Sequence, residues 1–324
     1  MVARADLPPV ARLDGPHPIT RADIAPLNVL FSDTFTERYR RDGLVGVRVP
    51  PLNPVIWQYA VADAGAGAML WRDGRGAIAA FNIAHRSGVE GWMGPLAVRD
   101  DCQGTGEGKR IVTAGLDLLR RSGCAVIGLE TMPRTMDNIG FYSRLGFVPS
   151  RLTVTLTLDA VTAPRAPRLL SSFRSAARDD AIRECAALVA ETLPGFDYTR
   201  EIELTHELSL GDTLLVYDGD RLTGFAVCHA APLVEGRARE ELRVLKAFVR
   251  EEAMFDHMAV QLADLARRTG TSRVAIRLQG DYAGLYARLV SFGAHVRWTD
   301  LRMVLAGYEE RPPKFGVALS NWEI

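Results

Sequence analysis

The stretch LAVRDDCQGTGEGKR, residues 96–110, decides the fold of this 324-residue chain, because it joins an apolar strand to a helix through a glycine-rich turn. The glycines are Gly104, Gly106 and Gly108, and Lys109 follows at once. Glycine lets the backbone turn so that several N–H groups converge, and the free amides at a helix start add the positive end of the helix dipole. The stretch therefore predicts a site for phosphate oxygens.

Two common phosphate-binding motifs do not fit this string. A Walker A loop needs a glycine where Gln103 stands and a hydroxyl group where Arg110 stands. A dinucleotide-binding G-x-G-x-x-G motif needs its third glycine one residue later and belongs in an opening βαβ unit. This loop lies about a hundred residues into the chain and follows a predicted hairpin. Neither motif therefore explains it.

The segments around the loop alternate between strand and helix patterns. Residues 22–44 have a helical pattern, and Asp73-Gly74 marks the turn of a hairpin between two apolar runs. Residues 89–98 form the strand that enters the loop, and residues 124–130 form a buried strand. A short helix ended by Gly146 and a final strand complete a mixed α/β unit.

A second unit repeats this order. The segment DAVTAPRAPR, residues 159–168, suits neither helix nor strand and predicts a linker. After it, GLYARL at 284–289 matches GFYSRL at 140–145, and a second hairpin turn stands at Asp218-Gly219. The repeated order predicts two tandem copies of one fold, over residues 1–158 and 169–324, each with a mostly antiparallel sheet flanked by helices.

A family resemblance follows from the loop and from the order of elements. The string fits the pattern Q/R-x-x-G-x-G/A at Gln103, Gly106 and Gly108, and Y-x-x-x-G-F stands at residues 142–147. In this order, residues 20–158 resemble the GNAT superfamily of acetyltransferases. The whole chain resembles a tandem GNAT protein whose second copy has degenerated.

The resemblance implies where acetyl-CoA binds and which residue helps the chemistry. The pantetheine arm is expected to lie along the backbone of Leu96, Ala97 and Val98. The pyrophosphate is expected on the amides of the loop and helix start, which are Gln103, Gly104, Thr105, Gly106, Glu107, Gly108 and Lys109. Tyr142 occupies the position of a general acid that protonates the leaving thiolate, and packing with Phe141 is its alternative role.

The remaining candidate site residues are predicted less directly from the sequence. Thr135 stands where many relatives carry an asparagine, so Asn138 is expected either to cap the helix or to contact the pantetheine arm. Glu90 begins the cofactor strand and His85 ends the strand before it, which makes Glu90 a candidate general base and His85 its alternative. Both are expected near the mouth of the acceptor site, where a solvated rim position is the other interpretation.

The second copy differs at the loop. No glycine occurs between Val249 and Thr269, and Glu251, Glu252 and Asp256 bring negative charge to the place of the pyrophosphate. Tyr286 matches Tyr142 in position but lacks the loop beside it. We therefore expect this copy to fold without binding CoA in the usual way and to wall the acceptor side of the cleft. The tail, residues 311–324, is expected to add a strand or to cover a sheet edge.

Composition limits the partners. The 39 basic and 39 acidic residues cancel, so bulk charge predicts neither nucleic acid nor a membrane surface as a partner. The N-terminal residues lack the apolar segment of a signal peptide, and no apolar run has the length of a membrane span. Four widely spaced cysteines without C-x-x-C predict neither a disulfide framework nor a structural zinc site. A cytoplasmic protein without a metal ion is expected.

Two functions from different classes fit these observations. The first is an acetyl-CoA-dependent N-acetyltransferase that acts on a primary amine of a small molecule or peptide, by direct attack in a ternary complex. The second is a non-catalytic module that senses acyl-CoA. A third function, transfer of a longer acyl chain, requires a cleft of sufficient depth, which the sequence does not give. The sequence also identifies neither the acceptor nor the oligomeric state.

Overall fold

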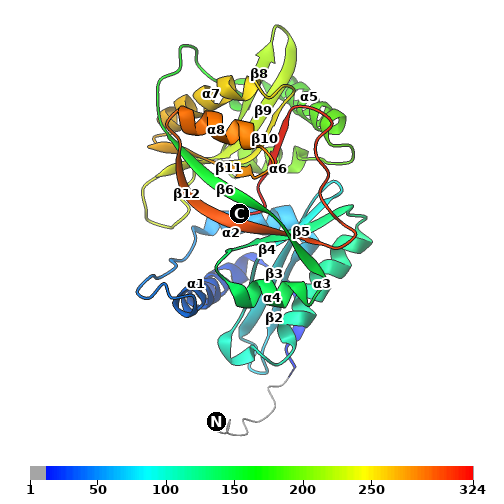
Figure 1. The fold of residues 1–324 in the computed structure, drawn as a ribbon. Helices are drawn as coiled ribbons and strands as arrows, with labels where there is room; N and C mark the ends of the chain where they lie inside the picture. The colour runs from blue at the N-terminus through cyan, green and yellow to red at the C-terminus, as the bar shows by residue number, and fades with distance from the viewer. Residues whose placement is uncertain (1–11, 324) are drawn as a thin grey trace.

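The computed structural model describes residues 12–323. The first eleven residues, on which the expectation of no signal peptide rests, and Ile324 lie outside this part. The N-terminal half, residues 12–158, follows the expected order of elements (Figure 1). They are β1 (Asp14–Pro18), α1 (Ile24–Arg41), α2 (Pro54–Ala64), β2 (Ala68–Arg72), β3 (Ile78–Ser87), β4 (Glu90–Val98), α3 (Glu107–Arg121), β5 (Val126–Thr131), α4 (Met136–Ser143) and β6 (Phe147–Asp159).

The C-terminal half, residues 169–323, repeats this order and adds a strand at its end. Its elements are α5 (Ser175–Thr192), α6 (Thr199–Glu207), β8 (Gly211–Asp218), β9 (Arg221–His229), β10 (Glu241–Val249), α7 (Met254–Arg268), β11 (Arg273–Gln279), α8 (Ala283–Ser291), β12 (His295–Leu305) and β13 (Val317–Ser320), preceded by the two-residue strand β7 (Arg168–Leu169). The expected strand in the tail is therefore present. No helix in the described residues is both long and apolar enough to cross a bilayer.

Short-range signals set several of these elements. The side chain of Asn53 accepts a hydrogen bond from the amide of Val55 and caps α2, whose first residue is Pro54. In the first hairpin, the Asp73 carboxylate accepts hydrogen bonds from two turn amides, and Gly76 adopts a positive φ of 79°. Both hairpins form where the Asp-Gly pairs predict them.

The two halves exchange their last long strands. The sheet order is β1-β2-β3-β4-β5-β12-β6-β11-β10-β9-β8-β7, so β12 of the C-terminal half lies against β5 of the N-terminal half. Likewise, β6 of the N-terminal half lies against β11 of the C-terminal half, and β6 and β12 pair with each other. Both strands cross the middle of the molecule (Figure 1). The expected mixed α/β fold is confirmed, with the two sheets joined into one.

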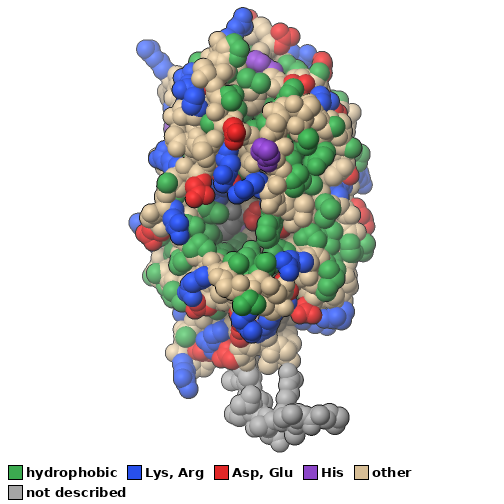
Figure 2. All heavy atoms as spheres, turned by 60° about the vertical axis from the view of Figure 1, so that its left-hand side comes forward, with side chains coloured by type: hydrophobic (Ala, Val, Ile, Leu, Met, Phe, Trp, Pro, Cys, Tyr) green, Lys and Arg blue, Asp and Glu red, His purple; other side chains and the backbone are tan. Residues whose placement is uncertain are grey.

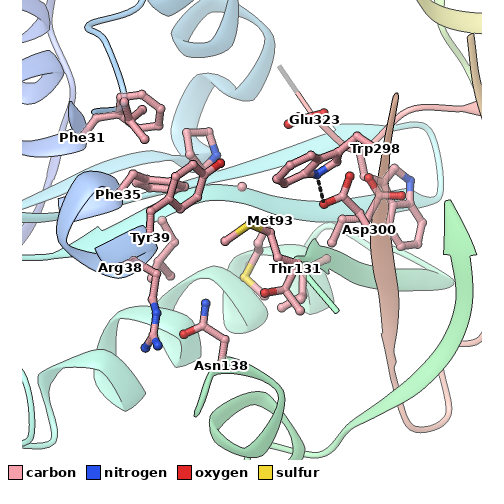
Figure 3. Close-up of a pocket in the computed structure, with 18 of the residues that line it drawn as sticks. Phe31, Phe35, Arg38, Tyr39, Met93, Thr131, Asn138, Trp298, Asp300 and Glu323 are labelled. Atoms are coloured by element: carbon pink, nitrogen blue, oxygen red, sulfur yellow. Dashed lines mark hydrogen bonds between the residues drawn. The ribbon is translucent and has the colours of Figure 1, made fainter. Parts of the chain in front are cut away.

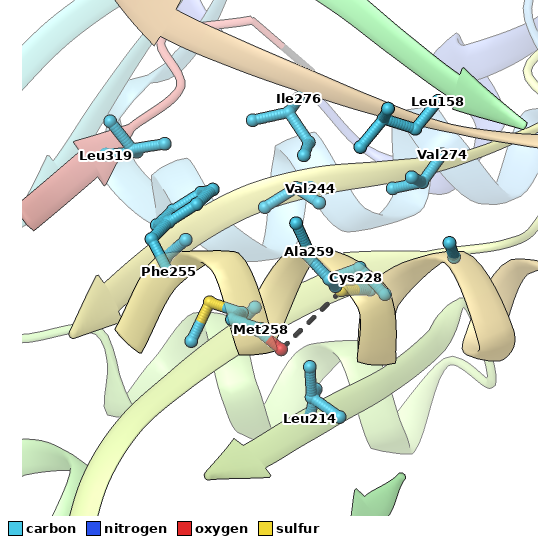
Figure 4. Packing of buried hydrophobic residues seen from close by; sticks show 14 of the residues in the cluster. Leu158, Leu214, Cys228, Val244, Phe255, Met258, Ala259, Val274, Ile276 and Leu319 are labelled. Atoms are coloured by element: carbon cyan, nitrogen blue, oxygen red, sulfur yellow. Dashed lines mark hydrogen bonds between the residues drawn. The ribbon is translucent and has the colours of Figure 1, made fainter. Parts of the chain in front are cut away.

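The exchanged strands carry core residues with them. Met303 and Leu305 of β12 are buried in the N-terminal core under α3, and Leu156 and Leu158 of β6 are buried in the C-terminal core under α7. Figure 4 shows Leu158 beside Ile276 and Val274 in that second core. Each half therefore completes its hydrophobic core with a strand that belongs to the other.

The sheet opens at one place in each half. β4 and β5 run parallel and pair only from Glu90–Val126 to Met93–Leu129. β10 and β11 pair only from Glu241–Arg273 to Arg243–Ala275. Beyond these pairs, the strands diverge. In the C-terminal half, β13 fills the opening and pairs with β10 from Lys246 to Val249. In the N-terminal half, the opening leads into a cavity.

Candidate active site

The glycine-rich loop forms one wall of a cavity of about 480 Å³. Gly104 and Gly106 have φ values of +75° and +93°, in the left-handed region that favours glycine, and no atom lies within 4 Å of where their Cβ would be. Gly106 is the N-cap of α3, so the first amides of that helix have no carbonyl partner within it. The loop therefore presents open, unpaired donors to the cavity, which suits an anion.

The cavity has a rim of basic side chains that sequence reasoning identified only in part. The predicted residues Gln103, Gly108 and Lys109 line it, and so do Leu96, Ala97 and Val98. Arg38, Arg41 and Arg144 line it as well, from α1 and from the end of α4. Arg38 forms ion pairs with Asp42 and Asp137, and Arg41 forms ion pairs with Glu37 and Asp100. These arginines lie far from the loop in sequence, which is why the motif did not reveal them.

The side chains of three predicted residues stabilise the conformation of the loop. The Gln103 amide donates to the carbonyl oxygen of Val98 at 2.7 Å, and the Thr105 hydroxyl donates to the carbonyl oxygen of Cys102 at 2.7 Å. The buried Glu107 carboxylate accepts from Arg110 at 2.5 Å. Neither Thr105 nor Glu107 lines the cavity with the other predicted residues. Their side chains fix the loop, and only their backbone amides remain for a ligand.

The free edge of β4 continues from the loop into the opening of the sheet. On one side, Leu96, Ala97 and Val98 pair with Asn82, Phe81 and Ala80 of β3. On the other side, β5 has already diverged. A backbone edge of this kind can hydrogen-bond an extended, amide-containing ligand as an added strand would.

Tyr142 lies where this cavity meets a second one. It is half-buried on α4, and its ring packs against Phe141 and Phe147 with centroid distances of 5.2 and 5.9 Å. Burial raises the pKa of the Tyr142 phenol to about 12, so the phenol stays protonated at neutral pH. Tyr142, Asn138, Leu96, Arg38 and Phe35 line both cavities, which therefore adjoin at the phenol.

Asn138 does not cap α4. The helix begins at Met136 after Thr135, and Asn138 is its third residue. The Thr135 hydroxyl instead donates to Asp42 at 2.7 Å. In Figure 3 the amide of Asn138 points towards the cavity. The capping expectation is therefore wrong, and the side chain is free to contact a ligand.

The second cavity has a volume of about 330 Å³ and is built by both halves. The molecule is hollowed on the face shown in Figure 2. From α1 come Phe31, Phe35 and Tyr39, and from β4 and β5 come Met93, Leu129 and Thr131 (Figure 3). From the C-terminal half come Leu233, Val234, Arg277, Trp298, Asp300, Trp322 and Glu323. The walls are mainly apolar, and most of the charge lies at the C-terminal side.

Two buried arginines hold the charged side of the second cavity together. Glu130 of β5 accepts hydrogen bonds from Arg277 at 2.6 Å and from Arg302 at 3.0 Å. Burial would raise the pKa of Glu130, but these two guanidinium groups lower it to about 2. Arg277 also pairs with Glu323 at 2.5 Å and lies 3.0 Å from Asp300. Glu130 is therefore held in its charged form, and it links β5 to Arg277 of β11 and Arg302 of β12.

Asp300 is the carboxyl group in this cavity whose charge is least stabilised. Its side chain is buried, and Oδ1 accepts a hydrogen bond from the Trp298 indole at 3.1 Å (Figure 3). Burial raises the pKa of Asp300 to about 7, the Glu323 and Glu130 carboxylates act in the same direction, and Arg277 opposes them. Sequence reasoning missed Asp300, because it lies on β12 and reaches the cavity only through the strand exchange.

Glu90 and His85 do not lie at the mouth of either cavity. Glu90 is 1% exposed, and its carboxylate accepts hydrogen bonds from Tyr198, Ser320 and Trp322 at 2.8–2.9 Å. His85 is fully buried, stacks on Trp92 and contacts the Asp63 carboxylate at 2.5 Å. The expected position of both residues near the mouth of the acceptor site is wrong, and so is the solvated-rim alternative, because α6 and the tail of the C-terminal half cover the ends of β3 and β4.

The equivalent region of the C-terminal half is closed. β13 occupies the opening beside β10, and Arg288 pairs with Glu252 at 2.9 Å and with Asp256 at 3.0 Å where the loop would be. Tyr286, the counterpart of Tyr142, is exposed and lines neither of the two cavities described above. The two halves therefore share a fold but present different surfaces.

Comparisons with known proteins agree with this architecture. Residues 32–147 match the model of the acetyltransferase (GNAT) family. A search of curated protein sequences gave no match. Among solved structures, a putative acetyltransferase from Pyrococcus horikoshii is 13% identical, with a TM-score of 0.68, and the alignment covers 99% of this chain and 98% of that one.

Two further structures have similar folds. A tandem GNAT protein from the clavulanic acid biosynthesis pathway is 13% identical, with a TM-score of 0.56 and coverage of 89% of this chain and 96% of that one. Saccharomyces cerevisiae N-myristoyltransferase with bound myristoyl-CoA is 11% identical, with a TM-score of 0.63 and coverage of 96% and 82%. At these identities the likeness concerns the fold, and it extends over both halves.

Proposed function

We propose that the protein transfers an acetyl group from acetyl-CoA to a primary amine, because residues 32–147 match the model of the acetyltransferase (GNAT) family. The observation that supports this most directly is the pair of adjoining cavities with Tyr142 between them. One cavity suits an extended anionic donor, and the other suits an acceptor. A thioester placed at their junction would lie beside the phenol.

The first cavity has the features that a CoA donor requires. The open positions beside Gly104 and Gly106 and the free amides of α3 suit the pyrophosphate, and the rim arginines add positive charge. The edge of Leu96–Val98 suits the amides of the pantetheine arm. The amides from Gly104 to Lys109 are proposed to bind the phosphates, and Asn138 is proposed to contact the arm near the sulfur.

The size of the second cavity favours a short acyl group. About 330 Å³ lies at the lower end of the range for small-molecule sites, and this volume has to hold the acyl group together with the acceptor. An acetyl group leaves most of the space to the amine. A long acyl chain would occupy it, which is why we favour acetyl-CoA over longer donors.

The proposed reaction is direct transfer in a ternary complex. The amine nitrogen forms a bond to the acyl carbon while the carbon–sulfur bond breaks, and the Tyr142 phenol gives its proton to the leaving sulfur. Its raised pKa keeps this proton in place until the thiolate develops. The nitrogen loses one proton as the amide forms, and this proton restores the phenol. The alternative function is an acyl-CoA sensor. The developed second cavity favours the enzyme, because a sensor needs no acceptor site.

The test is release of free thiol from acetyl-CoA in the presence of a panel of amines. The Tyr142→Phe variant is expected to lower kcat by roughly 100- to 10,000-fold with little change in the KM for acetyl-CoA, because the proton acts only in the chemical step. Tyr286→Phe, the same change at the equivalent position of the C-terminal half, is the matched control and should keep wild-type activity. Amine-independent binding of acetyl-CoA without any turnover would instead favour the sensor.

A further inference from the structure

The cavity wall carries a carboxylate that shares its cationic partner with two other carboxylates. Oδ2 of Asp300 lies 3.0 Å from Nη2 of Arg277 but meets the geometry of a hydrogen bond with no residue in 12–323, while Oδ1 accepts from Trp298. The same Nη2 donates to Glu130 at 2.6 Å, so Asp300 receives only part of one guanidinium group and can still accept a hydrogen bond from a ligand. The other two carboxylates of the cavity are engaged: Glu130 by Arg277, Arg302 and Thr153, and the largely exposed Glu323 by Arg277.

The charges around Asp300 leave room for one more cation. Glu130 faces it from β5, Arg277 from β11 and Glu323 from the tail. Tyr39 lies nearby on α1, where burial, and after it the Glu323 and Asp300 carboxylates, raises the pKa of its phenol. Arg302 is shared between Glu130 and Glu310. Three carboxylates thus face Arg277 and a share of Arg302, which leaves an excess of negative charge that an ammonium group would balance.

We propose that Asp300 receives the ammonium group of the acceptor and removes its proton, and that the aromatic walls hold an apolar body attached to that amine. This inference rests on the proposed function and adds the base and the substrate class to it. The proton passes from the amine to the Asp300 carboxylate, and the freed nitrogen lone pair forms the bond to the acyl carbon. The sulfur takes its proton from Tyr142, and the second proton that the nitrogen loses as the amide forms restores the Tyr142 phenol. The proton on Asp300 then passes to solvent, so all the proton transfers balance.

The surroundings of Asp300 suit this task. A base that works near neutral pH needs a pKa near 7, and burial raises that of Asp300 to about this value. The opposite wall, Phe31, Phe35 and Tyr39, is aromatic and lies across the cavity from Trp298 in Figure 3. An acceptor with a carboxylate next to its amine would meet Glu130 and Glu323, so the class is an arylalkylamine rather than an amino acid.

The first experiment compares two acceptors that share the same body. Wild-type enzyme is expected to acetylate 2-phenylethylamine with a kcat/KM at least tenfold above that for phenylalanine, which differs only by a carboxylate beside the amine. Equal or greater activity with phenylalanine would overturn the assigned substrate class. If no amine in the panel releases thiol, the proposed function itself fails, which separates the two results.

The second experiment tests the base with Asp300→Asn, which keeps an oxygen for the Trp298 donor. We expect kcat to fall at least 100-fold, the wild-type rise in kcat through pH 7 to disappear, and the KM for acetyl-CoA to stay within a factor of three. Asp159→Asn, on the neighbouring β6 and exposed, is the matched control. A variant within twofold of wild type with the same pH profile would overturn the assignment.

A further variant keeps the proposal testable if Asp300→Asn does not fold. Trp298→Phe removes the hydrogen bond that favours the charged form of Asp300. The pKa of Asp300 should then rise, so the acidic limb of the kcat profile should move to higher pH. An acidic limb that stays at its wild-type position in this variant would count against Asp300 as the base.

Discussion

Replacing Trp322 by alanine tests whether the tail holds the two halves together. Trp322 is 2% exposed and packs with Trp92, Val126 and Val304. Its indole N–H donates to Glu90 at 2.8 Å, and its ring lies 3.8 Å from the Arg302 guanidinium carbon. One side chain of the tail therefore contacts β4, β5 and β12 together.

The expected loss of stability can be estimated from these contacts. Removing a buried aromatic side chain costs roughly 3–5 kcal/mol, and the site offers little freedom to collapse because sheet residues surround it. The lost bond to the Glu90 carboxylate is charge-assisted and moves the value to the upper end of that range. We expect Trp322→Ala to lower the free energy of unfolding by about 4–5 kcal/mol.

The assay is equilibrium unfolding in urea, followed by far-UV circular dichroism. Trp322→Phe keeps most of the aromatic surface but loses the N–H donor, so we expect the free energy of unfolding to fall by about 2 kcal/mol. Trp298→Ala is the matched control, because this indole is 40% exposed, and a loss of about 1 kcal/mol or less is expected. A Trp322→Ala protein within 1 kcal/mol of wild type would refute this account of the tail.

Two further predictions concern the loop and the strand exchange. Gly106→Val should weaken acetyl-CoA binding at least tenfold in calorimetry, because a side chain there is strained at φ +93° and enters the open space beside the loop. Gly123→Val is the matched control, since Gly123 lies at the other end of α3 with φ +76° and equally open surroundings. It should cause similar backbone strain but leave the affinity for acetyl-CoA unchanged. Thermal unfolding should show one cooperative transition for both halves, because β6 and β12 complete each other's cores, and two separate calorimetric peaks would contradict this.

Local features of the site were predictable from the sequence. The glycine-rich turn at Gly104 and Gly106 and both hairpins depend on a few adjacent residues, and the structure contains that turn and both hairpins. The conformational demands of a tight turn or a helix start leave few alternatives. Such features can therefore be read from a short string.

Features that depend on strand partners were not predictable. β6 and β12 hold the same place in the order of elements of the two halves, and nothing in either strand predicts which half it will join. Asp300 therefore could not be assigned to the site of the N-terminal half. Glu90 was placed at the correct end of β4, but its burial comes from Tyr198 and Trp322, more than a hundred residues away. The sequence pattern predicts the strand or helix to which a residue belongs, whereas the elements that pack against it determine its burial and its contacts.

The strand exchange has a consequence for the order in which the protein is made. β5 pairs with β12 through Thr131 and Leu301, which are about 170 residues apart in the chain. At about 5–20 residues per second, a ribosome needs roughly ten to thirty seconds to synthesise that distance. During this interval β6 reaches the open edge of β5 first, since it begins only sixteen residues after β5 ends. The growing chain therefore meets a competing, unexchanged arrangement before the native partner of that edge exists.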